Sequence, residues 1–279
     1  MNFSFILKAA ILGIVEGLTE FLPVSSTGHL IIFSNLLRFS ENTTFANMFT
    51  MVIQLGAILA VLVLYRKKIA DTIIHLFPSK NTPVEKSGLY FWGMIVISCV
   101  PAALIGIPFD DLIEEKLFNP LVVACALFIG GLWMIYAENK LKGNQIASLS
   151  DTLITPQMAI IVGLFQVLSI VPGMSRSAST IIGGWIAGLS TVAAAEYSFF
   201  LAIPVMFGQA LLNILKAQNT LTSMEWIGLG VGFVVSFVVA LIVIDSFLTY
   251  LKKKPMKVFA IYRIIFAFIV LACGMIGFF

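Results

Sequence analysis

Six long apolar runs dominate the sequence and restrict the fold it can adopt. They lie at about residues 45–65, 89–107, 121–137, 192–215, 226–248 and 258–279. Each is close to the length that an α-helix needs to cross the hydrocarbon core of a bilayer. Of the 279 residues, 59% are hydrophobic and only 11% are charged, whereas soluble domains are roughly 25% charged. We therefore predict an all-α polytopic membrane protein with a single membrane domain over residues 1–279, and a soluble enzyme is excluded.

Two further apolar segments, 6–37 and 156–189, are interrupted in the middle. The interruptions, at 23–29 and 172–177, are rich in proline, glycine and hydroxyl residues. Neither half of either segment is long enough to cross a bilayer alone. Irregular backbone at membrane depth is tolerated only where it is buried in protein or lines a wet cavity. We therefore predict two re-entrant helix-loop-helix hairpins.

The two hairpins resemble each other at an offset of 150 residues. The matching pairs are Gly13 and Gly163, Glu16 and Gln166, Leu18 and Leu168, and Ser25 and Ser175. Each half of the chain, about 1–145 and 146–279, then holds one hairpin and three crossing helices. Three is an odd number, so the second half enters the membrane from the opposite face. This predicts an inverted-topology repeat, whose broken helices tend to meet near the membrane midplane.

The basic residues predict the orientation. With alternating crossings, one side receives Arg66, Lys67, Lys68, Lys80, Lys86, Lys140, Lys142, Lys252, Lys253, Lys254 and Lys257. The other side receives Lys8, Arg38, Lys116 and Lys216, with the acidic Asp110, Asp111, Glu114 and Glu115. Cytoplasmic loops carry the excess of Lys and Arg. We expect the first group in the cytoplasm, and both termini and the mouth of the first hairpin outside.

Other global features exclude some partners. The net charge of +3 is small, and no basic tract with interleaved aromatics suggests a nucleic acid partner. Cys99, Cys125 and Cys273 lie in apolar runs without ligand-like spacing, so we expect buried thiols, no disulfide and no zinc site. Glu196 and Arg263 lie near predicted helix ends, where snorkelling or local pairing is expected.

Glu16 and Glu20 are four residues apart, so they project from one face of a helix. An ionised carboxylate inside a membrane is costly unless it has a partner. The two could reach the interface and pair with lysines, or they could hold Mg²⁺ or Ca²⁺ through hard oxygen ligands. A third alternative is that one of them acts as a base or orients a histidine.

Hydroxyl residues and a histidine follow in the first break. Ser25, Ser26 and Thr27 could be ordinary helix caps. A hydroxyl beside a histidine is also the arrangement that activates a nucleophile, because the histidine can take its proton. His29, one of two histidines in the chain, is close enough in sequence for that role.

The second break supplies a cation. Arg176 is flanked by Ser175 and Ser177, and Thr180 follows one turn later. A guanidinium fork with backbone N–H groups at a helix N-terminus is a good phosphate clamp, although a structural pair with a glutamate is the alternative. If the hairpins converge, Glu16, Glu20, Ser26 and His29 face Arg176 across a small polar cavity. An apolar lining would then suit a lipid tail.

These two motifs resemble those of a known family. The run 16–29 (EGLTEFLPVSSTGH) and the run 172–180 (PGMSRSAST) are similar to the two signatures of the undecaprenyl-diphosphate phosphatase family, also called bacitracin-resistance, BacA or UppP, in order and spacing. The resemblance extends over essentially the whole chain. It implies a phosphatase of the bacterial inner membrane that removes the terminal phosphate of undecaprenyl diphosphate at the outer face. That reaction recycles the lipid carrier for peptidoglycan synthesis and confers bacitracin resistance.

The resemblance also implies the site and a divalent cation. The family's functional residues correspond to Glu16, Glu20, Ser26, His29, Ser175, Arg176, Ser177 and Thr180. We expect Ser26 to be the nucleophile and His29 its base, oriented by Glu20, while Glu16 and Glu20 hold Mg²⁺ or Ca²⁺. Ser25, Thr27 and Gly173 are expected to help bind substrate.

Several alternatives stay open at this stage. A phosphohistidine on His29 and attack by metal-bound water compete with Ser26 as the route of hydrolysis. A transporter that flips a polyprenyl phosphate is the alternative function, since many carriers also have inverted repeats with broken helices. The expected partners are the polyprenyl diphosphate substrate and membrane lipids, and a homodimer is compatible with this interpretation.

Overall fold

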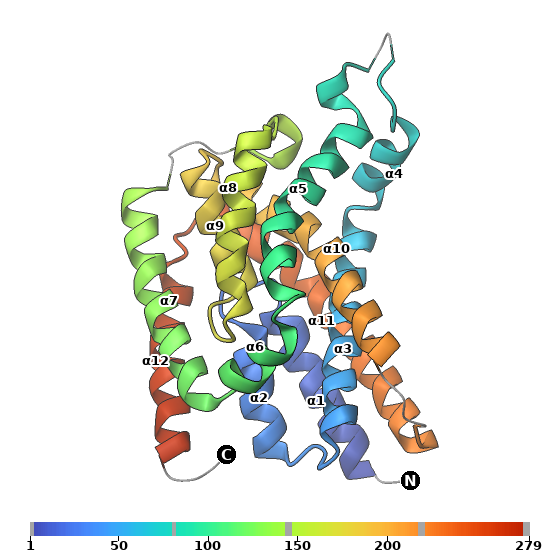
Figure 1. Ribbon diagram of the computed structural model, residues 1–279, viewed down its shortest axis with the longest axis vertical. Helices are drawn as coiled ribbons and strands as arrows, with labels where there is room; N and C mark the ends of the chain where they lie inside the picture. The colour runs from blue at the N-terminus through green and yellow to red at the C-terminus, as the bar shows by residue number, and fades with distance from the viewer. Residues whose placement is uncertain (1–2, 80–81, 143–146, 217–220, 276–279) are drawn as a thin grey trace.

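The protein is a bundle of helices (Figure 1). The computed structural model describes residues 3–79, 82–142, 147–216 and 221–275, and within these ranges one isolated β-bridge joins Ser79 to Thr82. The helices are α1 (Phe3–Thr19), α2 (Ser26–Leu37), α3 (Thr43–Leu64), α4 (Arg66–Ile74), α5 (Gly88–Gly106), α6 (Asp110–Leu117), α7 (Pro120–Lys140), α8 (Pro156–Gln166), α9 (Arg176–Ile186), α10 (Thr191–Lys216), α11 (Ser223–Leu251) and α12 (Lys257–Met275). Short 3₁₀ turns are η1 (Val84–Lys86), η2 (Leu149–Asp151) and η3 (Val167–Ile170). Lys80, the side chains of Asp110, Asp111, Glu114 and Lys216, and the last four residues of the expected run 258–279 lie outside the described part.

The six expected spans are confirmed as helices long and apolar enough to cross a membrane. They are Thr44–Leu64, Gly88–Gly106, Pro120–Lys140, Thr191–Leu211, Ser223–Leu251 and Lys257–Met275. Their bounds agree with the apolar runs to within a few residues. Two short helices in the connections, α4 and α6, were not expected, because charged residues there left no apolar run of spanning length.

Each interrupted segment forms a pair of helices joined by a short stretch outside the α-helices, which in the second segment includes the 3₁₀ turn η3. The first pair is α1 and α2, and the second is α8 and α9. Figure 1 shows the first pair in the lower part of the bundle and the second in the upper part, so that the two bends meet near the middle. The start of α1 and the end of α12 lie at the same end of the molecule, away from α4.

The two bends have matching local geometry. Ser25 caps α2 with φ 72°, and its hydroxyl accepts the backbone N–H of Gly28 at 3.4 Å. Ser175 caps α9 with φ 70°, and its hydroxyl accepts the N–H of Ala178 at 3.3 Å. Positive φ is uncommon outside glycine. Two serines 150 residues apart therefore share both an unusual backbone conformation and a cap, in line with the matching sequences.

Each helix pair packs on a helix from the other half of the chain. A Cβ atom on Gly13 of α1 would lie 2.6 Å from the carbonyl oxygen of Gly232 on α11. A Cβ on Gly163 of α8 would lie 2.7 Å from the carbonyl oxygen of Ser98 on α5. Small residues let membrane helices approach this closely. The positions matched in sequence therefore make the equivalent contact, with the halves exchanged.

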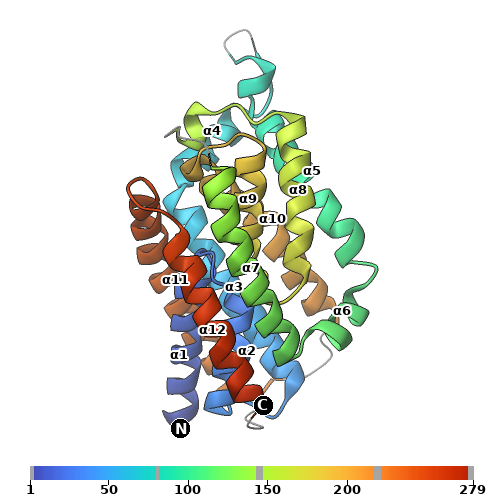
Figure 2. The same cartoon turned by 90° about the vertical axis from the view of Figure 1, so that its left-hand side faces the viewer.

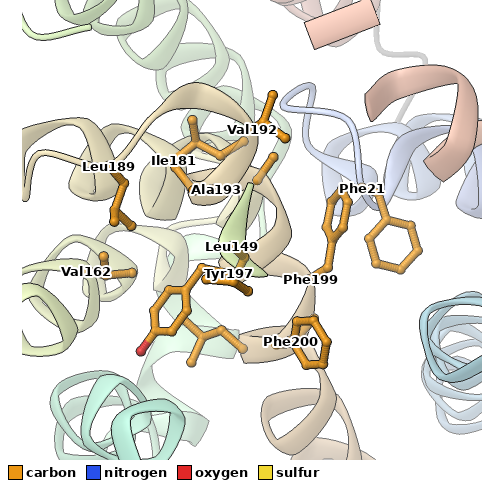
Figure 3. Packing of buried hydrophobic residues seen from close by; sticks show 14 of the residues in the cluster. Phe21, Leu149, Val162, Ile181, Leu189, Val192, Ala193, Tyr197, Phe199 and Phe200 are labelled. Atoms are coloured by element: carbon orange, nitrogen blue, oxygen red, sulfur yellow. The ribbon is translucent and has the colours of Figure 1, made fainter. Parts of the chain in front are cut away.

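A large aromatic cluster on α10 supports the first bend. Phe21 packs edge-on against Phe199, with 5.3 Å between the ring centroids, as Figure 3 shows. Tyr197, on the same helix, is fully buried, and its hydroxyl donates to the carbonyl of Met94 at 2.9 Å. Aromatic pairs of this geometry add to the energy of burial. Because Phe21 follows Glu20, this cluster holds the acidic residue in place.

The expectation of three buried thiols is wrong. Cys125 is exposed on the bundle surface, while Cys99 and Cys273 are only partly buried. An apolar run has the same composition whether its side chains face protein or lipid, so the sequence could not separate the two cases.

Candidate active site

The bends of the two hairpins are joined by an ion pair and a hydrogen bond. Nη2 of Arg176 donates to Oε1 of Glu20 at 3.0 Å, and their side chains are only 11% and 6% exposed. The hydroxyl of Ser177 donates to the carbonyl of Leu22 at 2.9 Å. The predicted convergence of the two breaks is therefore confirmed, and it places opposite charges in contact inside the bundle.

The other oxygen of Glu20 binds a serine. The Oγ atom of Ser26, the first residue of α2, donates to Oε2 of Glu20 at 2.5 Å. A short hydrogen bond to a carboxylate is the strong, charge-assisted kind. Glu20 thus accepts from a hydroxyl and from a guanidinium on separate oxygens. The Ser26 hydroxyl therefore lies beside a carboxylate that can accept its proton, and the positive charge of Arg176 is on the other oxygen of that carboxylate.

Arg176 is also held from the side of α10. Its Nη1 donates to the backbone carbonyl of Ser198 at 2.9 Å and lies 3.4 Å from the hydroxyl of the same residue. That hydroxyl accepts from Thr180 Oγ1 at 2.7 Å. The guanidinium is therefore held between Glu20 and Ser198, and the pair with a glutamate that the sequence analysis gave as the alternative to a phosphate clamp is present. The sequence analysis missed Ser198, because a single serine inside an apolar run has no distinctive signal.

His29 lies beside α12, away from the Glu20 carboxylate. Its Nδ1 is 2.8 Å from the carbonyl of Ser25, and its Nε2 is 2.7 Å from the hydroxyl of Tyr262. Its ring stacks on Phe266, with the centroids 4.0 Å apart. Since the carbonyl can only accept, Nδ1 carries the proton and Nε2 accepts from Tyr262. The expected orientation of His29 by Glu20 is not present, because both ring nitrogens have other partners.

Glu16 is a fully buried acid whose close polar neighbour is the carboxyl group of Glu20. Neither of its carboxylate oxygens makes a hydrogen bond with the residues that the structure describes. It lies one turn before Glu20 and within electrostatic reach of it. The described ranges contain no group of three or more acidic, histidine or cysteine side chains that would form a ready metal site. Within the described ranges, Glu16 forms no ion pair with a lysine at the hairpin mouth.

The other predicted residues line the two bends. Ser25 and Ser175 act as helix caps, and the Ser175 hydroxyl is also 3.1 Å from that of Ser177. Thr27 is half-buried on α2. Gly173 has φ +100°, and a Cβ there would lie 2.6 Å from the carbonyl oxygen of Val123, so only glycine fits without strain.

A second buried arginine was not expected in this region. Arg263 lies in α12 and is fully buried, so the expectation that it snorkels from a helix end is wrong. Its Nη2 donates to the carbonyls of Gly173 at 2.9 Å and Met174 at 3.0 Å. The bend of the second hairpin lies over this side chain. A contact between segments so far apart in the chain leaves no local sequence pattern. Glu196, in contrast, pairs as expected, accepting the hydroxyl of Tyr65 at 3.2 Å.

Comparisons with known proteins agree with this arrangement. The family model described as "Bacitracin resistance protein BacA" matches residues 9–269. The chain is 57% identical to the undecaprenyl-diphosphatase of Ruminiclostridium cellulolyticum, covering 99% of this chain and 98% of the relative. It is 54% identical to that of Clostridium novyi, covering 97% and 96%. Both the matched length and the identity are well beyond what a shared fold alone requires, and the chain therefore belongs to the bacitracin resistance protein BacA family.

Proposed function

We infer that this protein is a membrane phosphatase that hydrolyses undecaprenyl diphosphate to undecaprenyl phosphate and inorganic phosphate. The observation that carries this inference is the continuous chain from Ser26 to Glu20 to Arg176 across the two hairpins. It unites a hydroxyl, a base and a phosphate-binding cation in one enclosed place. The identity of the substrate is inferred from the relatives, which are named undecaprenyl-diphosphatase.

We propose that Ser26 is the nucleophile. Its Oγ attacks the terminal phosphorus while its proton moves to Glu20, which already accepts a hydrogen bond from it. The bond between this phosphorus and the bridging oxygen breaks, and the lipid monophosphate leaves. Water then hydrolyses the phosphoserine to release inorganic phosphate. Arg176 and the N–H groups at the start of α2 and α9 stabilise the charge on the transferred phosphate.

This scheme changes the role expected for His29. The contacts of both its ring nitrogens support a positioning role at the first bend, where it links Ser25 to Tyr262. A phosphohistidine intermediate would require Nε2 to leave the Tyr262 hydroxyl. The geometry therefore favours Ser26 over His29, and direct attack by metal-bound water is the second competitor.

We also propose that Glu16 and Glu20 hold a divalent cation, Mg²⁺ or Ca²⁺. The buried carboxylate of Glu16, whose two oxygens lack a hydrogen-bond partner among the described residues, fits a hard cation. Such a cation would neutralise charge on the diphosphate oxygens. Mg²⁺ commonly takes one or two carboxylates from the protein and the remaining ligands from substrate and water. Isothermal titration of wild type and Glu16→Gln with MgCl₂ tests this without reference to turnover, and equal heats in both contradict it.

A polyprenyl-phosphate transporter was the alternative interpretation. The comparisons do not support it, since the relatives are named as diphosphatases. The decisive experiment is release of inorganic phosphate from undecaprenyl diphosphate by the purified protein in detergent. Wild type should release phosphate and Ser26→Ala should not. A wild-type protein that releases none would reject the proposed activity, because a carrier needs no bond cleavage.

We propose that the two helix pairs re-enter the bilayer of the bacterial inner membrane and that the first opens outward. Helix α4, whose first three residues are basic, and the start of α1 lie at opposite ends of the bundle, which supports a cytoplasmic α4 and outward termini (Figure 1). A homodimer stays a prediction, and the mass of the protein in detergent, corrected for the micelle, would test it.

A further inference from the structure

The buried side chain of Arg263 is a costly feature that the proposed reaction does not use. It is fully buried, and no ion pair with an acidic residue is found for it within the described ranges. Its Nε and Nη1 atoms have no hydrogen-bond partner there. A buried charge without a counter-charge destabilises a fold. A chain that retains one therefore gains something else from it.

The one nitrogen of Arg263 that is engaged binds the second bend. Nη2 donates to the carbonyls of Gly173 and Met174, and it lies 3.4 Å from the carbonyl of Ala126 on α7. Backbone carbonyls outside a helix have no water to bind at membrane depth, so they need a donor from the protein. Arg263 supplies that donor to two successive residues of the bend.

These two carbonyls immediately precede the start of α9. The next residue, Ser175, has φ 70° and caps the helix, and Arg176 is its first residue. The position of the bend thus determines where the Arg176 side chain begins. A shift of about 1 Å in a positioning element can reduce turnover about a hundredfold, even when the shifted residue is distant from the chemistry.

Helix α7 also contacts the second bend and the Arg263 side chain. It runs beside α12 in Figure 2, and a Cβ atom on its Gly130 would overlap Nη2 of Arg263. A Cβ on Gly173 would in turn lie 2.9 Å from the Cβ of Ala126. The bend, the guanidinium and α7 are therefore in contact beside a small cavity lined by Gly130, Met174 and Arg263, and Gly130 leaves the space that the guanidinium occupies.

From these contacts we infer that Arg263 is a positioning residue for Arg176, acting through the Gly173–Met174 carbonyls; this rests on the proposed phosphatase function. The neighbouring Tyr262 holds His29 of the first hairpin. Adjacent residues of α12 therefore secure both bends, one through a phenol and the other through a guanidinium.

The test is a double-mutant cycle in purified protein, with kcat/KM for undecaprenyl diphosphate and Tm measured for each variant. Arg263→Met should lower kcat/KM at least about thirtyfold and Arg263→Lys by less, since lysine keeps one donor. In the Arg176→Lys background, Arg263→Met should lower kcat/KM by no more than about threefold. The reason is that the Arg176 guanidinium, which Arg263 positions, is already absent. A purely structural role predicts independent losses that multiply, and that outcome overturns the inference.

One further variant, with two controls, keeps the test decisive if Arg263→Met does not fold. Gly130→Ala displaces the guanidinium without removing it, and it should lower kcat/KM about tenfold or more. Gly93→Ala is its control, because a Cβ there meets nothing within 4 Å, and Arg38→Met is the control for loss of an exposed arginine. If Gly130→Ala and Arg263→Lys both turn over substrate at the wild-type rate, the inference about Arg263 is refuted while the proposed function stands. If the wild-type protein is inactive, the proposed function is refuted.

Discussion

Arg176 and Glu20 form an ion pair 3.0 Å long, although 156 residues separate them in the chain. Each belongs to the bend of a different hairpin, and the pair is largely enclosed. Bringing two charges out of water is expensive, and their attraction repays the cost only when the geometry is good. Removing either partner leaves the other buried and unpaired, so each is required for the site to keep its shape.

Arg176→Lys is expected to remove most phosphatase activity with little change in Tm. Lysine keeps the positive charge beside Glu20 but loses the planar fork that spans Glu20 and Ser198. Phosphate release and thermal unfolding of the purified variant measure the two effects. Normal hydrolysis by the lysine variant would show that Arg176 is not the phosphate clamp.

Glu20→Gln should reduce kcat by at least about a hundredfold, the usual scale for loss of a general base. The amide retains the shape of the side chain but cannot accept the Ser26 proton. Exposed Glu41 offers a matched control, and Glu41→Gln should behave as wild type. Comparable turnover in the two variants would exclude Glu20 as the base.

Ser26→Ala is expected to be less active than His29→Gln by about tenfold or more, since a nucleophile contributes more than a residue that orients the bend. Ser26 contacts Glu20, whereas His29 contacts Ser25 and Tyr262. Mass spectrometry of protein quenched during turnover should locate phosphate on Ser26. Phosphate on His29, or an active Ser26→Ala, would reverse the assignment.

Impermeant thiol labelling of intact cells should report the orientation. After replacement of the native cysteines, a cysteine at Glu115 should react from outside, whereas one at Lys253 should react only after permeabilisation. Both positions are exposed in the structure. Lys253 lies in the basic turn between α11 and α12, which we place in the cytoplasm. Outside labelling at Lys253 would invert the topology.

Gly163→Ala should lower the stability of the folded protein by about 1–3 kcal/mol, the usual cost of overpacking. The added Cβ would lie 2.7 Å from the carbonyl oxygen of Ser98 on α5. Gly93→Ala, on α5 with open space around it, is the control and should have a Tm close to that of wild type. Equal melting of the two variants would mean that the α5–α8 contact is looser than the structure describes.

The sequence predicted the fold well because length and apolarity are local properties. Six spans follow from runs of residues, and two bends follow from the proline, glycine and hydroxyl clusters within such runs. The repeat added the long-range information that the two bends meet. That convergence predicts that Glu20 and Arg176 lie close together, as the ion pair confirms.

The parts of the site that were missed depend on which helix packs against which. His29 was expected near Glu20 because they are close in sequence, but α2 presents its ring to α12. Arg263 has an ordinary place near a helix end, and it is buried because the second bend and α7 contact it. Ser198 becomes a partner of Arg176 through the approach of α9 and α10. Such contacts between distant elements have no counterpart in local composition.

The exchange of packing partners between the halves affects the order of events during synthesis. The glycine of α1 that contacts α11 waits for a partner made about 220 residues later. At about 5–20 residues per second, the ribosome needs roughly 10–45 s to supply it. Throughout that interval α1 carries the carboxylate of Glu16, which is buried in the finished fold, without the helix against which α1 packs. The packing of α1 on α11 can therefore form only when translation is nearly complete.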